Sequence, residues 1–179
     1  IGVGAQYYTE GAQWSGTFTT GIYKSIDNGD NWSKLTLNTT EGSPYEPNDF
    51  EIAADNSIWL GSERNVWGHG GGTVFKSTDG STFSVLHTIT NGRRTEVAVS
   101  KQNANTVYVL AQVKTTSENS DIAPYVSMVK TTDGFTTSTA MGLPNDADTG
   151  IVFNDFTRGQ AGNNLMLEVD PNDDTVLFT

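Results

Sequence analysis

Residues 23–32 read YKSIDNGDNW, and the same arrangement returns at 75–83 as FKSTDGSTF and more faintly at 129–137 as VKTTDGFTT. The aspartates of the three stretches, Asp27, Asp79 and Asp133, lie 52 and then 54 positions apart. A spacing of this order is typical of proteins built from a repeated structural unit. The chain is therefore expected to repeat one unit along its length.

The composition indicates β structure. The 179 residues suit one domain, and the 19 glycines accompany many Thr, Ser, Asn and Asp residues. No stretch shows the 3.6-residue periodicity of an amphipathic helix. The formal charge of −11 argues against nucleic-acid binding, which usually needs a basic stripe, and is interpreted as a solubilising surface. Without cysteine, a disulfide framework or a thiolate metal site is impossible.

Short apolar or alternating runs between clusters of Gly, Asn and Asp predict four strands in each unit. The clearest unit, 50–89, has predicted strands at 50–54, 57–61, 73–77 and 83–89. The next unit, 95–141, has them at 95–99, 106–113, 125–130 and 136–141. Two partial units complete the chain: 1–37 with strands at 1–8, 21–25 and 32–37, and 165–179 with strands at 165–169 and 175–178.

Four antiparallel strands per repeat of this length are typical of a β-propeller blade. The predicted fold is therefore all-β, a β-propeller segment with two complete and two partial blades in one domain. Closed rings typically have four to eight blades, so we interpret the sequence as part of a larger propeller. The alternative is that several chains together complete the ring.

The repeated stretch resembles the Asp-box, or BNR repeat, with the pattern Ser-x-Asp-x-Gly-x-Thr-Trp. The matching residues are Ser25, Asp27, Gly29 and Trp32, then Ser77, Asp79, Gly80, Thr82 and Phe83, and then Thr131, Asp133 and Gly134. Asp-box propellers occur in sialidases, sortilin-type receptors, xyloglucan-degrading glycosidases and photosystem assembly factors. The resemblance implies Asp-box hairpins between the third and fourth strands of each blade. It also implies a segment of a large secreted bacterial protein.

The repeated aspartates are interpreted as structural. An Asp side chain accepts hydrogen bonds from backbone N–H groups of its own turn, and Gly supplies backbone angles that other residues avoid. The aromatic residue is expected to fold over the hairpin and bury its ring. The alternative is that Asp27 or Asp79 is a catalytic acid or a calcium ligand, but residues 27–30 lack the other ligands of a calcium loop. No cofactor and no metal is expected.

Long loops are predicted to gather at one end of the sheets, at 9–20, 62–72 and 114–124, and at the connections 38–49 and 142–164. Binding residues tend to lie on such loops over a rigid scaffold. This loop face would carry six candidate ligand-binding residues: Trp14, Tyr45, Trp67, Arg93, Arg94 and Arg158. Exposed aromatic rings beside polar groups suit stacking on sugars or binding to a protein. The alternative is that these rings only hold the loops in place. The HGGG run at 69–72 is interpreted as a flexible loop.

The sequence favours a non-catalytic module of an extracellular or cell-surface protein, acting as a scaffold or binding a glycan or a protein. Its expected partners are the remaining blades of the propeller and such a ligand, with no direct membrane insertion. The alternative is part of a glycoside hydrolase, which needs two carboxylates roughly 5 to 9.5 Å apart. Carboxylates expected at the loop face are Glu10, Glu41, Glu46, Asp49, Glu63, Asp121, Asp146, Asp148 and Asp155.

Overall fold

The computed structural model describes residues 1–8, 13–15, 19–113, 125–145, 148–150 and 156–179. Within these ranges the chain forms fifteen strands and no helix, so the all-β prediction is confirmed. Accordingly, no helix suited to crossing a membrane is found in this part of the chain. Every paired strand runs antiparallel to its neighbour.

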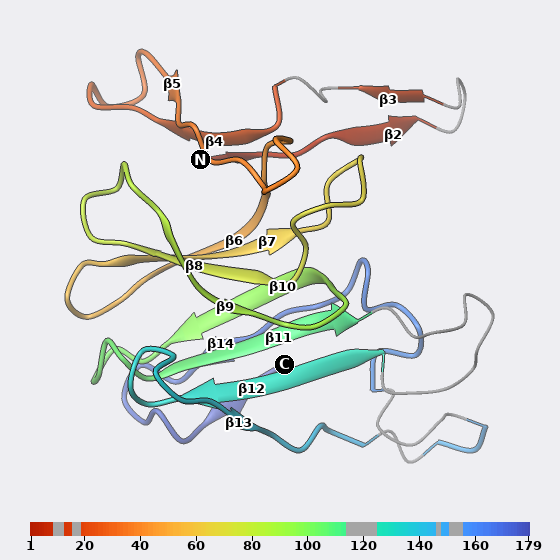
Figure 1. The fold of residues 1–179 in the computed structure, drawn as a ribbon. Coiled ribbons are helices and arrows are strands. Elements are labelled where there is room, and N and C mark those ends of the chain that lie inside the picture. Colours follow the sequence, from red (N-terminus) through yellow and green to blue (C-terminus); the bar gives the residue numbers. More distant parts are fainter. Residues whose placement is uncertain (9–12, 16–18, 114–124, 146–147, 151–155) are drawn as a thin grey trace.

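Two four-stranded sheets form the centre of the molecule (Figure 1). The first contains β6 (Glu46–Ile52), β7 (Ile58–Glu63), β8 (Thr73–Ser77) and β9 (Ser84–Thr88). The second contains β10 (Gly92–Val99), β11 (Val107–Val113), β12 (Val126–Thr131) and β13 (Thr139–Ala140). In both sheets, strands that follow one another in sequence also lie side by side.

Smaller sheets flank these two. On one side, β1 (Gly2–Val3) pairs with β4 (Gly21–Lys24), which pairs with β5 (Ser33–Lys34); on the other, β14 (Glu168–Val169) pairs with β15 (Leu177–Phe178). The predicted strand at 1–8 is broken. Its second part, β2 (Gln6–Tyr8), forms a hairpin with β3 (Gln13–Ser15), inside the segment expected to be a loop. Figure 1 shows this hairpin projecting beyond the stacked sheets.

The central sheets are buried on both faces. Successive side chains of a strand point to opposite faces, so alternate residues enter different cores. Trp59 and Val74 pack toward β10 and β11, whereas Leu60 and Phe75 pack with Ile22 of β4. In the same way, Val97 and Val109 belong to the core shared with β7, while their neighbours face β14. This double burial explains the nearly continuous apolar runs in the sequence.

Several strands differ in length from the prediction. β6 begins at Glu46 rather than at residue 50, and Pro47 lies at a register shift, where its missing N–H is tolerated. β10 begins at Gly92 rather than at residue 95. Conversely, β5 and β13 each have only two residues, both exposed.

The long and short connections separate to opposite ends of the sheets. In Figure 1 the β2–β3 hairpin and the loop after β7 lie at the right, and the turns after β6 and β8 lie at the left. The described sheets form an open stack and are not closed into a ring. The end that carries the loop after β7 holds the candidate site.

Candidate functional site

A pocket of about 420 Å³ lies between the loop after β7 and the loop-face ends of β10 and β11. We call it the Trp67 pocket, and its lining residues are Glu63, Arg64, Asn65, Val66, Trp67, Gly68, Arg93 and Gln112. Trp67 is 44% exposed, so its indole is accessible to solvent. The pocket therefore combines an accessible indole with carboxylate, guanidinium and amide groups.

The loop that carries Trp67 is folded around one buried side chain. Asn65 is 3% exposed, and its Oδ1 accepts hydrogen bonds from the backbone N–H groups of Trp67 (3.1 Å) and His69 (3.0 Å). Two backbone bonds close the same turn, from Asn65 N–H to His69 O and from Gly68 N–H to Asn65 O. The expected flexible loop is therefore internally hydrogen-bonded at 65–69.

The glycine run that follows allows this loop to approach its neighbours. Gly70 has a φ of +77°, and a Cβ there would lie 2.7 Å from the ring of Tyr45. Gly72 has a φ of +73°, and a Cβ there would meet the backbone of Ile89 and Gly92. Any larger residue would clash with backbone or strain the left-handed conformation. The glycines thus serve close packing rather than flexibility.

Charges of both signs border the pocket. Glu63, the last residue of β7, is half-buried, and this burial raises its pKa. The positive charges of Arg94 and Arg64 oppose the rise in the pKa of Glu63, while the Glu96 carboxylate adds to it. Arg64 is exposed and Arg93 is half-buried on β10. The site can therefore donate hydrogen bonds from two guanidinium groups and accept them at one carboxylate.

The structure brings together Trp67 and Arg93 of the six predicted ligand-binding residues. Trp14 lies on β3, but its side chain is outside the described part of the chain. Arg158 does not line the Trp67 pocket and instead forms an ion pair with Asp148.

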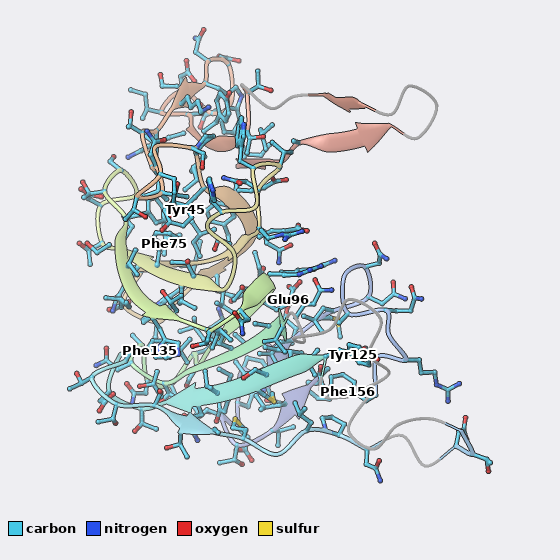
Figure 2. All side chains as sticks on the ribbon, turned by 45° about the vertical axis from the view of Figure 1, so that its right-hand side comes forward. Tyr45, Phe75, Glu96, Tyr125, Phe135 and Phe156 are labelled. Carbon is cyan, nitrogen blue, oxygen red and sulfur yellow. The ribbon has the colours of Figure 1, made fainter. Side chains whose placement is uncertain are left out.

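Tyr45, another of the six predicted residues, does not line the Trp67 pocket. Its ring packs edge-on against the fully buried Phe75, with centroids 4.8 Å apart, and Figure 2 shows the two residues together in the interior. Tyr45 is partly buried and packs against the core between β4 and β8. A tyrosine in a polar connection gave no local sign of this contact, because Phe75 is thirty positions away.

Arg94 does not line the Trp67 pocket either. Its Nε donates to Glu96 Oε1 at 2.7 Å, and its terminal nitrogens donate to backbone carbonyls of Gly162, Asn163 and Leu165. All three guanidinium nitrogens are thus engaged within the protein. Arg94 attaches the segment before β14 to the β10–β13 sheet.

The repeated aspartates accept hydrogen bonds within their own turns. Asp27 Oδ1 accepts from Asn31 N–H at 2.9 Å, and Asp79 Oδ1 accepts from the N–H groups of Ser81 and Thr82, both at 2.7 Å. Asp133 Oδ1 accepts from Thr137 N–H at 2.9 Å. The hydroxyl groups two residues before each aspartate, on Ser25, Ser77 and Thr131, donate to the same carboxylates. Among the described residues, no group of three or more His, Cys, Asp or Glu is arranged to hold a metal ion.

Trp32 departs from the expected burial. Its ring is 49% exposed because its Nε1 donates to Gly29 O at 3.0 Å and holds the indole against its own turn. Phe83, at the corresponding place in the second copy, is partly buried against Leu60 and Phe75. The two turns therefore use their aromatic residues differently.

Two carboxylates that were expected on loops lie on adjacent strands instead. Glu46 on β6 is directly opposite Glu63 on β7. Glu46 is 8% exposed, its Oε1 accepts from Ala5 N–H at 3.0 Å, and burial raises its pKa to about 7, aided by the Glu63 charge and opposed by the Ala5 hydrogen bond. Among the other carboxylate candidates, Glu10, Asp121, Asp146 and Asp155 lie outside the described residues.

Only some residues of the Trp67 pocket could be predicted from the sequence. Exposure of Trp67 could be expected from its polar loop, but the importance of Asn65 could not, because its hydrogen-bond partners Ser43 and Pro44 are distant in sequence. Gln112 ends an apolar strand and carried no separate signal. The sequence matches no protein-family model, and no similar characterised protein is found. The function of this chain is therefore inferred from the chemistry of the Trp67 pocket.

Proposed function

We propose that this chain is a segment of an Asp-box β-propeller that binds a glycan at the Trp67 pocket. Two observations support the propeller: the consecutive four-stranded sheets stack face to face, and the aspartate turns recur between the third and fourth strands. The remaining blades would complete the ring. We place the protein outside the cell or on its surface, which agrees with its acidic, cysteine-free composition.

The observation that carries glycan binding is an exposed indole held beside hydrogen-bonding groups. Sugar rings have an apolar face of C–H groups and a rim of hydroxyl groups. Trp67 provides an apolar surface for the former, and Arg64, Arg93, Glu63 and Gln112 provide donors and acceptors for the latter. A volume of about 420 Å³ accommodates a ligand of one or two sugar units.

The test is a panel of soluble oligosaccharides measured by isothermal titration calorimetry. Trp67→Ala should weaken binding about 30-fold or more, because a central aromatic anchor contributes about 2 kcal/mol or more. Trp32→Ala is the matched control, since it removes an equally exposed indole from the short-turn end. Equal affinities of the wild type and Trp67→Ala, or no binding by the wild type across neutral, acidic and amino sugars, would contradict the proposal.

A second candidate, hydrolysis of a glycosidic bond, is favoured by the Glu46–Glu63 pair. Directly opposed residues in an antiparallel pair have Cβ atoms about 4.5 to 5.5 Å apart, so the two glutamate side chains start from neighbouring positions. A pKa of about 7 would keep Glu46 protonated as a general acid below neutral pH. Release of reducing sugar that is abolished in both Glu46→Gln and Glu63→Gln would favour this function over binding alone.

A further inference from the structure

We propose that Asn65 is the positioning residue that holds Trp67 in the orientation required for ligand binding. The inference rests on the proposed glycan-binding function of the Trp67 pocket. Asn65 lies between the exposed Arg64 and the half-buried Val66, yet only 3% of its surface is accessible. A buried amide in a surface loop is retained only when its polar atoms are hydrogen-bonded, so the partners of Asn65 show what it organises.

The Asn65 side chain joins two loops. Its Oδ1 accepts from the N–H groups of Trp67 and His69, within its own loop. Its Nδ2 donates to Ser43 Oγ at 2.9 Å and to Pro44 O at 2.8 Å, in the connection before β6. One amide thus fixes the Trp67 backbone to a segment twenty residues earlier in the chain.

The second loop is itself anchored in the interior. Ser43 Oγ lies 3.1 Å from His69 Nδ1 and 3.0 Å from Thr39 Oγ1, which adds a second connection between the loops. The next residues lead to Tyr45, whose ring packs against Phe75. A continuous series of contacts therefore runs from the backbone of Trp67 to the core of the β6–β9 sheet.

Only asparagine satisfies this arrangement without rearrangement. Its carboxamide offers an oxygen that accepts two hydrogen bonds and an NH₂ group that donates two. Aspartate has the same shape, but it would place a second acceptor opposite the Pro44 carbonyl. Such fixation matters for binding because an indole that is already ordered loses little conformational freedom when a ligand stacks on it.

The first measurement needs no ligand. The ¹H–¹⁵N heteronuclear NOE of the Trp67 indole Nε1 reports its order on the picosecond-to-nanosecond timescale. We expect this NOE to fall in Asn65→Asp and Asn65→Ala, with glycan affinity reduced about 2- to 10-fold, the cost of immobilising one side chain. Asn48→Ala is the control, because Asn48 Nδ2 also links distant segments but donates to Thr95 O and Glu96 Oε1 of β10 and not to the Trp67 loop. It should lower the melting temperature and leave the Trp67 NOE unchanged.

An unchanged Trp67 NOE in a folded Asn65→Asp protein would overturn the assignment, whatever the result with glycans. If neither Asn65 variant folds, Ser43→Ala is the alternative, because it removes one hydrogen-bond partner of Asn65 Nδ2. This variant should cause a smaller fall in the Trp67 NOE, and an unchanged NOE would also overturn the assignment of Asn65. A reduced NOE combined with no glycan binding by the wild type would support Asn65 as the residue that orders Trp67. In that case, the proposed glycan-binding function would fail separately.

Discussion

Asp49 on β6 accepts a 2.8 Å hydrogen bond from the backbone N–H of Val97 on β10, so one carboxylate joins the two four-stranded sheets. Burial raises the pKa of Asp49 to about 6, against the opposing effect of the Val97 hydrogen bond and with an added contribution from Glu96. The folded protein therefore retains a proton on Asp49 at pH values where the unfolded chain has already released it. This junction makes the stability of the protein depend on pH.

We predict that Asp49→Asn stabilises the protein at alkaline pH. The pKa of Asp49 in the folded protein lies above its ordinary value of 3.8. The stabilising contribution of Asp49 is therefore fully present below pH 3.8 and is lost as the pH rises through about 6. At pH 8, Asn should raise the free energy of unfolding by about 1–3 kcal/mol and still accept from Val97 N–H. The gain should largely disappear at pH 4. Urea unfolding at both pH values measures this, and a less stable variant at pH 8 would mean that the negative charge is needed there.

Arg94→Ala should destabilise the protein by about 2–4 kcal/mol. The substitution removes hydrogen bonds to the carbonyls of residues 162–165 and leaves the buried Glu96 carboxylate without its 2.7 Å partner. Adding Glu96→Gln should recover part of the loss, because it removes the uncompensated charge. Thermal unfolding of the single and double variants measures the effect. If Arg94→Ala instead weakened glycan binding at unchanged stability, Arg94 would belong to the ligand site.

Asp79→Ala should lower the melting temperature more than Asp79→Asn does. The carboxylate accepts from two backbone N–H groups in its turn, and asparagine keeps one oxygen for them. These hydrogen bonds, first to Thr82 and then to Ser81, lower the pKa of Asp79 below its ordinary value of 3.8. The stabilisation is therefore present above pH 3.8 and is lost as the pH falls through the lower folded-state value. Calorimetric scans at pH 7 and at successively lower pH would show whether the difference between the wild type and Asp79→Ala shrinks; a difference independent of pH would contradict this role.

Tyr45→Ala and Trp67→Ala should separate stability from binding. Tyr45 packs against Phe75, so its truncation should cost about 2–3 kcal/mol, at the lower end for aromatic residues because Tyr45 is only partly buried. Trp67 is exposed, and its truncation should change stability by less than about 0.5 kcal/mol while abolishing glycan stacking. Urea titrations of both variants provide the comparison. Equal losses of stability would show that Trp67 is a packing residue as well.

The strands of the two central sheets could be predicted from sequence because local pattern and tertiary burial agree there. In β8 the predicted and observed bounds are both 73–77, since apolar residues face both neighbours and the flanking Gly72 and Asp79 mark the ends. The prediction was poorer at Pro47, which suggested a loop although a bulge accommodates it within β6. The residues of β2 fell inside the predicted strand at 1–8, but its partner β3 was missed because its three residues resemble an irregular loop.

The candidate site was less predictable, because its geometry depends on contacts between distant segments. The exposed Trp67 and the nearby Arg93 could be proposed from loop length and residue type alone. The different contacts of Arg93 and Arg94 could not, since the two residues are adjacent in sequence and lie where the register of β10 shifts. Similarly, nothing local distinguishes Tyr45, which packs inward, from a tyrosine that faces a ligand.

Because each central sheet contributes to two cores, loss of order in one sheet exposes an apolar face of the next. Unfolding should therefore advance along the stack from its ends, as in a one-dimensional array coupled between nearest neighbours. Amide protons of β11, which is fully buried over Val107–Ala111, should exchange most slowly, and those of the short strands β5 and β15 fastest. The Trp67 loop is anchored to the β6–β9 sheet, so it should keep its shape until that central sheet unfolds.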